Sequence, residues 1–166
     1  MARLPYAEPA NPAVPKLNIF RLLANADTIF EPWARYGLAL LRDTTVDPVV
    51  RELAILRVAA LTPGAEYEWV QHEAIARGVG ATDEQIAACR TGEGAEGTDA
   101  VVLRFTEEVV RDATPSDDTF ATMTQRFATQ EVVELLLVIG QYMTLARVMA
   151  TAQIDLDEPL GTSLID

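Results

Sequence analysis

The sequence predicts an all-α protein with one compact helical domain. Apolar residues recur at spacings of three and four along most of the chain, as on the buried face of a helix. Side chains that cap helix N-termini precede several of these segments. No segment shows a sustained alternation of apolar and polar residues, which a half-buried strand requires. We therefore predict about seven to eight helices within residues 16–166, and no strands.

The N-terminal segment, residues 1–15, is rich in proline and alanine. It lacks the long apolar run of a signal peptide, so we predict an extended arm. The first helical pattern begins after Lys16, where apolar residues follow the spacing of a helix face from 17 to 24. A second helix is predicted over about 32–41.

The next two helices are separated by a short break. Asp47 can cap free amides and Pro48 suits a first helical position, so a helix is predicted from 49 to about 61. The break at Pro63-Gly64 ends it, and a further helix is predicted over 65–77. Because the connection is short, we expect these two helices to pack as an antiparallel pair.

Four more helices complete the predicted domain. Thr82 with Gln85 forms a capping box that opens a helix to about residue 90. Further helices are predicted over 98–113, 116–127 and 130–153. The last contains the longest apolar stretch, 132–150, but three polar side chains interrupt it: Glu134, Gln141 and Arg147. We interpret it as a buried core helix and not as a membrane span.

Charge and cysteine content exclude several function classes. The formal net charge is −12, from 25 acidic and 13 basic residues. Such a surface disfavours binding to nucleic acid and to anionic membranes. Cys89 is the one cysteine, so no disulfide can form within the chain. This composition fits a reducing compartment, and we predict a cytoplasmic location.

The residues most suited to proton transfer are His72, Glu68 and Glu52. His72 is the one histidine, and Glu68 lies four residues before it on the same helix face. An ordinary Glu–His pair on a surface helix is the more common cause of this spacing. Glu52 stands in an otherwise apolar helix, where burial would raise the pKa of a carboxyl group. Alternatively, Arg51 and Arg57 neutralise it in a salt network.

Helix geometry allows Glu52 and His72 to meet. Glu52 lies about ten residues before the Pro63-Gly64 break and His72 about eight after it. With a rise of about 1.5 Å per residue, both lie at a similar height in an antiparallel pair. The periodicity does not fix the rotation of either helix, so contact remains a prediction.

Several stretches resemble the signature of the carboxymuconolactone decarboxylase family, which includes the alkylhydroperoxidase D-like proteins. The matching residues are Arg51-Glu52-Leu53, Val58-Ala59, Glu66-Tyr67-Glu68-Trp69-Val70-Gln71-His72, Ala76, Gly78 and Gly80. The resemblance implies an all-helical fold of the alkylhydroperoxidase D-like type. It also implies a homo-oligomer, typically a trimer or hexamer, with no metal and no organic cofactor.

One branch of that family carries a Cys-x-x-Cys-x-x-x-His motif preceded by a glutamate. Here His72 matches the histidine and Glu52 the glutamate, but Ala65 and Glu68 stand at the cysteine positions. Disulfide exchange needs a thiolate and a resolving thiol. A thiol peroxidase is therefore disfavoured, and the resemblance implies a Glu/His proton relay without redox chemistry.

The other branch decarboxylates a carboxylated lactone. The resemblance implies a cofactor-independent lyase in which His72, Glu52 and Glu68 transfer the proton. Four residues are candidates for substrate binding: Tyr67, Trp69, Arg57 and Tyr142. Aromatic residues at helical spacing are, however, more often core residues. Two alternatives stay open: another proton-transfer or hydrolytic enzyme acting on a small carbonyl compound, and a non-catalytic oligomeric binding protein.

Overall fold

The computed structural model describes residues 1–165, and within them the chain forms eight α-helices, one short 3₁₀ helix and no strand. This confirms the predicted all-α fold. The helices are α1 (Asn18–Leu23), α2 (Asp27–Arg42), α3 (Pro48–Leu61), α4 (Glu66–Gly78), α5 (Asp83–Thr91), α6 (Gly97–Asp112), α7 (Asp117–Arg126) and α8 (Thr129–Ala152), and the 3₁₀ helix is η1 (Gly161–Leu164).

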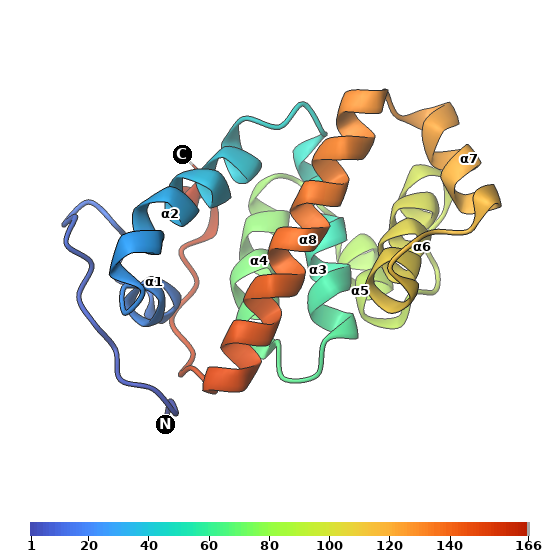
Figure 1. Cartoon of the computed structure of the whole chain (residues 1–166). Helices are drawn as coiled ribbons and strands as arrows, with labels where there is room; N and C mark the ends of the chain where they lie inside the picture. Colours follow the sequence, from blue (N-terminus) through green and yellow to red (C-terminus); the bar gives the residue numbers. More distant parts are fainter. Residues whose placement is uncertain (166) are drawn as a thin grey trace.

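Helix α3 is the centre of the fold. It packs against α4, α5, α6 and α8 (Figure 1), and every residue from Arg51 to Ala59 is buried. Its start is fixed as predicted, because the Asp47 carboxylate accepts hydrogen bonds from two backbone amides and Pro48 takes the first helical position. A helix enclosed on all sides must be apolar almost all round. The polar side chains of α3 are therefore exceptions that need partners.

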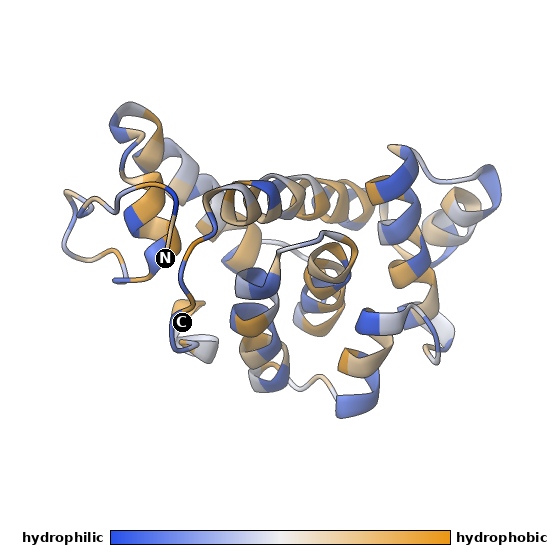
Figure 2. Ribbon diagram, turned by 90° about the horizontal axis from the view of Figure 1, so that it is seen from below, coloured by the Kyte–Doolittle hydropathy of each residue, from blue (hydrophilic) through white to orange (hydrophobic). Residues whose placement is uncertain are grey.

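Helix α8 crosses the face formed by α3 and α4 (Figure 1). It is long and apolar enough to cross a membrane by length and composition, but half of its most apolar stretch is buried inside the fold. Hydrophobic colouring predominates along this helix (Figure 2). Burial on this scale agrees with the predicted core helix.

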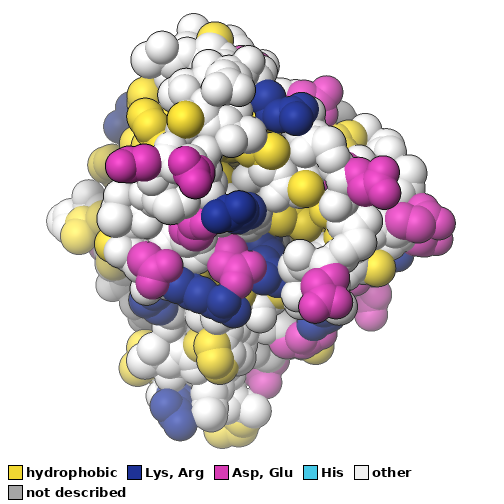
Figure 3. Space-filling model, turned by 90° about the vertical axis from the view of Figure 1, so that its right-hand side faces the viewer, with side chains coloured by type: hydrophobic (Ala, Val, Ile, Leu, Met, Phe, Trp, Pro, Cys, Tyr) yellow, Lys and Arg dark blue, Asp and Glu magenta, His cyan; other side chains and the backbone are white. Residues whose placement is uncertain are grey.

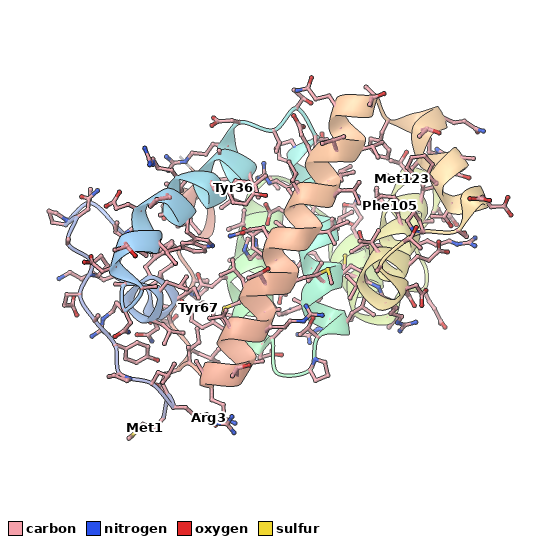
Figure 4. The ribbon with its side chains drawn as sticks, viewed as in Figure 1. Met1, Arg3, Tyr36, Tyr67, Phe105 and Met123 are labelled. Carbon is pink, nitrogen blue, oxygen red and sulfur yellow. The ribbon has the colours of Figure 1, made fainter. Side chains whose placement is uncertain are left out.

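The remaining elements lie at the two ends of this central group. Helices α5, α6 and α7 form one end, where Phe105 and Met123 (Figure 4) are almost completely buried. Helices α1 and α2 form the other end, beside the C-terminal segment (Figure 1). Residues 1–17 form no helix. They contact the rest of the same chain, where the backbone amide of Arg3 donates a hydrogen bond to the Ala152 carbonyl.

Two local features differ from the prediction. Helix α2 begins at Asp27 and continues through Pro32, which the prediction placed at its start. A proline at this position removes one intrahelical hydrogen bond, the one to the carbonyl of residue 28. Helix η1 has no periodic signal of its own and was not predicted. It packs against α4 at Gly78, where a Cβ atom would collide with the Thr162 side chain.

Glu108 connects α6 to the start of α7. Loss of solvent there raises the pKa of its carboxyl group, but hydrogen bonds from Arg104, Ser116 and Thr119 outweigh this and hold the pKa at about 2. A folded pKa below the unfolded value of about 4.3 stabilises the protein above that pH, and the contribution is lost as the pH falls toward 2.

We therefore expect Glu108→Gln to lower the free energy of unfolding by about 1 kcal/mol at neutral pH. The difference from wild type should shrink as the pH falls below about 4. Urea denaturation across this range measures both quantities. Glu96→Gln is the control, since that exposed side chain caps nothing; a difference that persists at low pH would contradict the assignment.

Helix α8 also presents an apolar stripe to solvent. Val133, Leu136 and Leu137 are exposed, and Gly140 continues the same helix face. We predict that a second copy of the chain covers this stripe. Wild type should be an oligomer in light scattering at micromolar concentration, and Leu137→Glu should dissociate it because a buried charge without a partner is costly. Phe120→Glu, on exposed α7, is the control; a monomeric wild type would contradict the prediction.

Candidate active site

A cavity of about 70 Å³ lies between α1, α2, α4 and α8. Its walls are mainly aliphatic and aromatic. Helices α4 and α8 contribute Tyr67 and five other polar or titratable side chains. The described residues that line it include no lysine and no arginine. The polar members are Glu68, Gln71, His72, Gln141 and Tyr142. Such a cavity suits a small, largely apolar molecule that makes a few directed hydrogen bonds.

Glu52 and His72 meet at the edge of this cavity. His72 Nδ1 lies 2.7 Å from Glu52 Oε2, and both side chains are buried. Arg51 Nε donates a hydrogen bond to the other carboxylate oxygen at 3.0 Å. The contact predicted from helix geometry is therefore present. The salt network proposed as its alternative exists as well, but only Arg51 takes part.

This arrangement orients the imidazole of His72. With a proton on Nδ1 donated to the Glu52 carboxylate, the free lone pair of a neutral ring is on Nε2. Nε2 has no hydrogen-bond partner among residues 1–165, and His72 lines the cavity. The Tyr142 ring packs edge-on against the imidazole, with centroids 4.6 Å apart. His72 can thus accept a proton from a molecule in the cavity, as a general base does.

Glu68 is separate from this pair. The sequence placed it on the same helix face as His72, but the structure pairs His72 with Glu52 and leaves both Glu68 oxygens without a hydrogen-bond partner. The Glu68 side chain is 2 % exposed, and this burial raises its pKa well above the ordinary value. Burial without a partner therefore favours the protonated, neutral form of the carboxyl group.

The cavity also receives Tyr67 and Tyr142, as predicted for substrate-binding residues. Tyr67 (Figure 4) extends from α4 toward α1, and its hydroxyl donates a 2.6 Å hydrogen bond to Asp157 in the C-terminal segment. Burial, and then the Asp157 carboxylate, raise the pKa of Tyr67. Burial, and then the charges of Glu52 and Glu68, raise the pKa of Tyr142. Both phenols remain neutral hydrogen-bonding groups.

The structure does not bring Arg57 and Trp69 to this cavity. Both face α5 on the opposite side of the α3–α4 pair. The Arg57 guanidinium donates to the Cys89 and Arg90 carbonyls and to the Glu107 carboxylate, below Gly92. Trp69 donates to Glu73, and the Arg90 guanidinium covers its ring. We therefore withdraw Arg57 and Trp69 as substrate-binding candidates, because the helix rotation turns them away from His72.

Gln141 is the cavity residue that the sequence reasoning did not assign. Its Nε2 is buried without a hydrogen-bond partner and faces Gly37 of α2. The signal in the sequence was its polarity within the apolar stretch of α8. The residues of α1 and η1 that line the cavity are apolar, so no polar residue within an apolar stretch marked them in the sequence. No group of three or more potential metal ligands occurs within residues 1–165.

The comparisons with known proteins agree with the fold and with this region of the chain. The sequence profile described as "Carboxymuconolactone decarboxylase family" matches residues 27–108, which contain Glu52, Glu68 and His72. None of the curated proteins matches the sequence significantly.

Three solved structures share the fold at low sequence identity. An uncharacterised peroxidase-related protein of Ralstonia eutropha JMP134, described as an alkylhydroperoxidase AhpD core, has a TM-score of 0.79 at 17% identity, over 99% of this chain and 94% of its own. An uncharacterised peroxidase-related protein of Silicibacter sp. TM1040 has a TM-score of 0.75 at 14% identity, and the match covers 85% of this chain and 76% of its own. A protein of unknown function from Agrobacterium tumefaciens, suggested to be an antioxidant defence protein AhpD, has a TM-score of 0.71 at 20% identity. The match covers 81% of this chain and 94% of its own.

We expect Arg51→Ala to destabilise the protein by about 3–5 kcal/mol, because it leaves the Glu52 carboxylate buried without its cation. Arg104→Ala is the matched control. It removes an exposed arginine from the mixed charges of the α6 surface (Figure 3) and should cost less than about 1 kcal/mol. Urea denaturation measures both. Equal losses of unfolding free energy in the two variants would show that the Arg51–Glu52 pair stabilises the protein no more than an exposed arginine does.

Proposed function

Because residues 27–108 match the profile of the carboxymuconolactone decarboxylase family, we propose that the protein is a cofactor-independent enzyme that transfers a proton on a small carbonyl compound. The observation that carries the proposal is the buried 2.7 Å contact between His72 and Glu52 beside an apolar cavity. A base held by a buried carboxylate and open to a cavity is the arrangement that general acid–base catalysis requires.

The chemistry follows from the free Nε2 of His72. Nε2 removes a proton from a carbon next to the carbonyl group, and the electron pair of that C–H bond moves to the carbonyl oxygen as an enolate. In a β,γ-unsaturated carbonyl compound, the imidazolium then returns the proton to the γ-carbon, and the carbon–carbon double bond moves into conjugation with the carbonyl group. Glu52 stabilises the imidazolium while it carries the proton, and the Arg51 guanidinium hydrogen-bonds the other oxygen of the same carboxyl group.

Decarboxylation of a carboxylated lactone is the second candidate. It ends with the same enolate, formed by loss of carbon dioxide instead of a proton, and the imidazolium supplies the proton that replaces the carboxyl group. The family description favours it. The cavity favours proton transfer, because no lysine or arginine among its described walls can pair with a substrate carboxylate.

Thiol peroxidase activity is disfavoured, although two of the structural neighbours are described as peroxidase-related. Cys89 lies outside the cavity, donates weak hydrogen bonds to backbone carbonyls and is completely buried. Burial raises the pKa of its thiol to about 12, so the nucleophilic thiolate is scarce at neutral pH.

We expect His72→Ala and Glu52→Gln each to abolish turnover of a substrate found by screening small ketones, lactones and keto acids. The double variant should be little worse than either single variant, since the two residues act as a unit. Deuterium uptake by the substrate carbon from heavy water, followed by NMR, is the measurement that detects proton transfer without knowledge of the product.

Glu73→Gln is the control on the same helix, since Glu73 lies outside the cavity. Circular dichroism and unfolding curves for each variant separate loss of activity from loss of fold. Undiminished deuterium exchange in both His72→Ala and Glu52→Gln would overturn the proposed role of the pair.

A further inference from the structure

We propose that Glu68 is a hydrogen-bond donor that binds the carbonyl oxygen of an uncharged ligand in the cavity, so that the substrate class is neutral ketones, lactones and esters and not carboxylate anions. This inference extends the proposed function and depends on it for the statement that the ligand is a substrate. The binding claim itself stands on Glu68, Gln141 and the cavity walls.

The first support is the isolation of the Glu68 carboxyl group. The side chain is 2 % exposed, it lines the cavity, and neither oxygen has a hydrogen-bond partner. A buried polar group without a partner is costly and usually marks a function. His72, one turn later on α4, directs Nδ1 to Glu52 and leaves Glu68 unpaired.

The second support is the charge around it. On α3, Arg51 and Glu52 form an ion pair; on α8, the Tyr142 phenol is close enough for the Glu68 charge to raise its pKa. No cation among the described residues pairs with Glu68. Burial without a cation or donor beside it favours the protonated form, which has an O–H group to donate. A neutral carboxylic acid in an apolar site can likewise donate a hydrogen bond to an oxyanion.

The third support is Gln141 on α8. Its Nε2 is a second buried donor without a partner, and it lines the same cavity. Two unpartnered donors match the two lone pairs of one carbonyl oxygen. A carboxylate ligand would add a negative charge to walls that contain no lysine or arginine, and would need Glu68 and Glu52 as near neighbours. The walls thus select against anions of the same shape.

The experiment compares two small ligands of nearly equal shape, butanone and propanoate, by calorimetric titration at neutral pH. We expect wild type to bind the ketone at least about tenfold more tightly than the carboxylate. Glu68→Met, which keeps the volume and removes the donor, should weaken ketone binding about five- to tenfold. Glu68→Gln, which keeps a donor, should stay within about threefold of wild type, and exposed Glu66→Gln should not differ from it.

Two further measurements separate binding from a structural role. Infrared spectra should contain the band of a protonated carboxylic acid that Glu68→Gln removes, and the C=O stretch of bound ketone should rise in Glu68→Met. Urea midpoints for Glu68→Met should equal or exceed that of wild type, since an unpartnered buried group is removed.

Ketone binding without any proton exchange would support this inference while counting against the proposed function. No ketone binding by wild type, tighter binding of the carboxylate, unchanged affinity in Glu68→Met or absence of the protonated band would each overturn it.

Discussion

A carboxylate at the centre of an apolar helical bundle requires a cation, and Arg51 supplies it for Glu52 on the neighbouring position of α3. The rest of the site depends on this pair. The other oxygen of Glu52 contacts Nδ1 of His72, which leaves Nε2 as the ring nitrogen without a partner among the described residues. This contact joins α3 to α4, and both side chains are buried. The buried ion pair and the proposed proton chemistry therefore depend on the same carboxyl group.

Two acids in one small region have different environments. Glu52 has a guanidinium and an imidazole beside it, while Glu68 has no hydrogen-bond partner among the described residues, and burial raises its pKa. Contrasts of this kind let enzymes separate the roles of paired carboxyl groups. The motif of the thiol-dependent branch implies a cysteine at the position where this chain has Glu68.

Much of this could be predicted from the sequence, and the failures have a common cause. The helices, their caps at Asp47, Thr82 and Ser116, and the height of Glu52 opposite His72 follow from local rules. The rotation of α3 and α4 does not, because helices buried on nearly all sides have no single apolar face to orient them. Arg57 and Trp69 were misplaced for that reason, and Glu68 was paired with the wrong neighbour. Helix η1 is too short to show a period at all.

The cavity is closed by both ends of the chain. Leu17, Ile19 and Phe20 come from the start of the helical region, while Leu164 comes from η1 near the C-terminus. The proton-transfer pair, by contrast, lies on adjacent helices in the middle of the chain, within the part that matches the family profile. Part of the cavity wall and the Glu52–His72 contact therefore come from separate stretches of sequence. A substitution near either terminus would change the shape of the cavity without touching that contact.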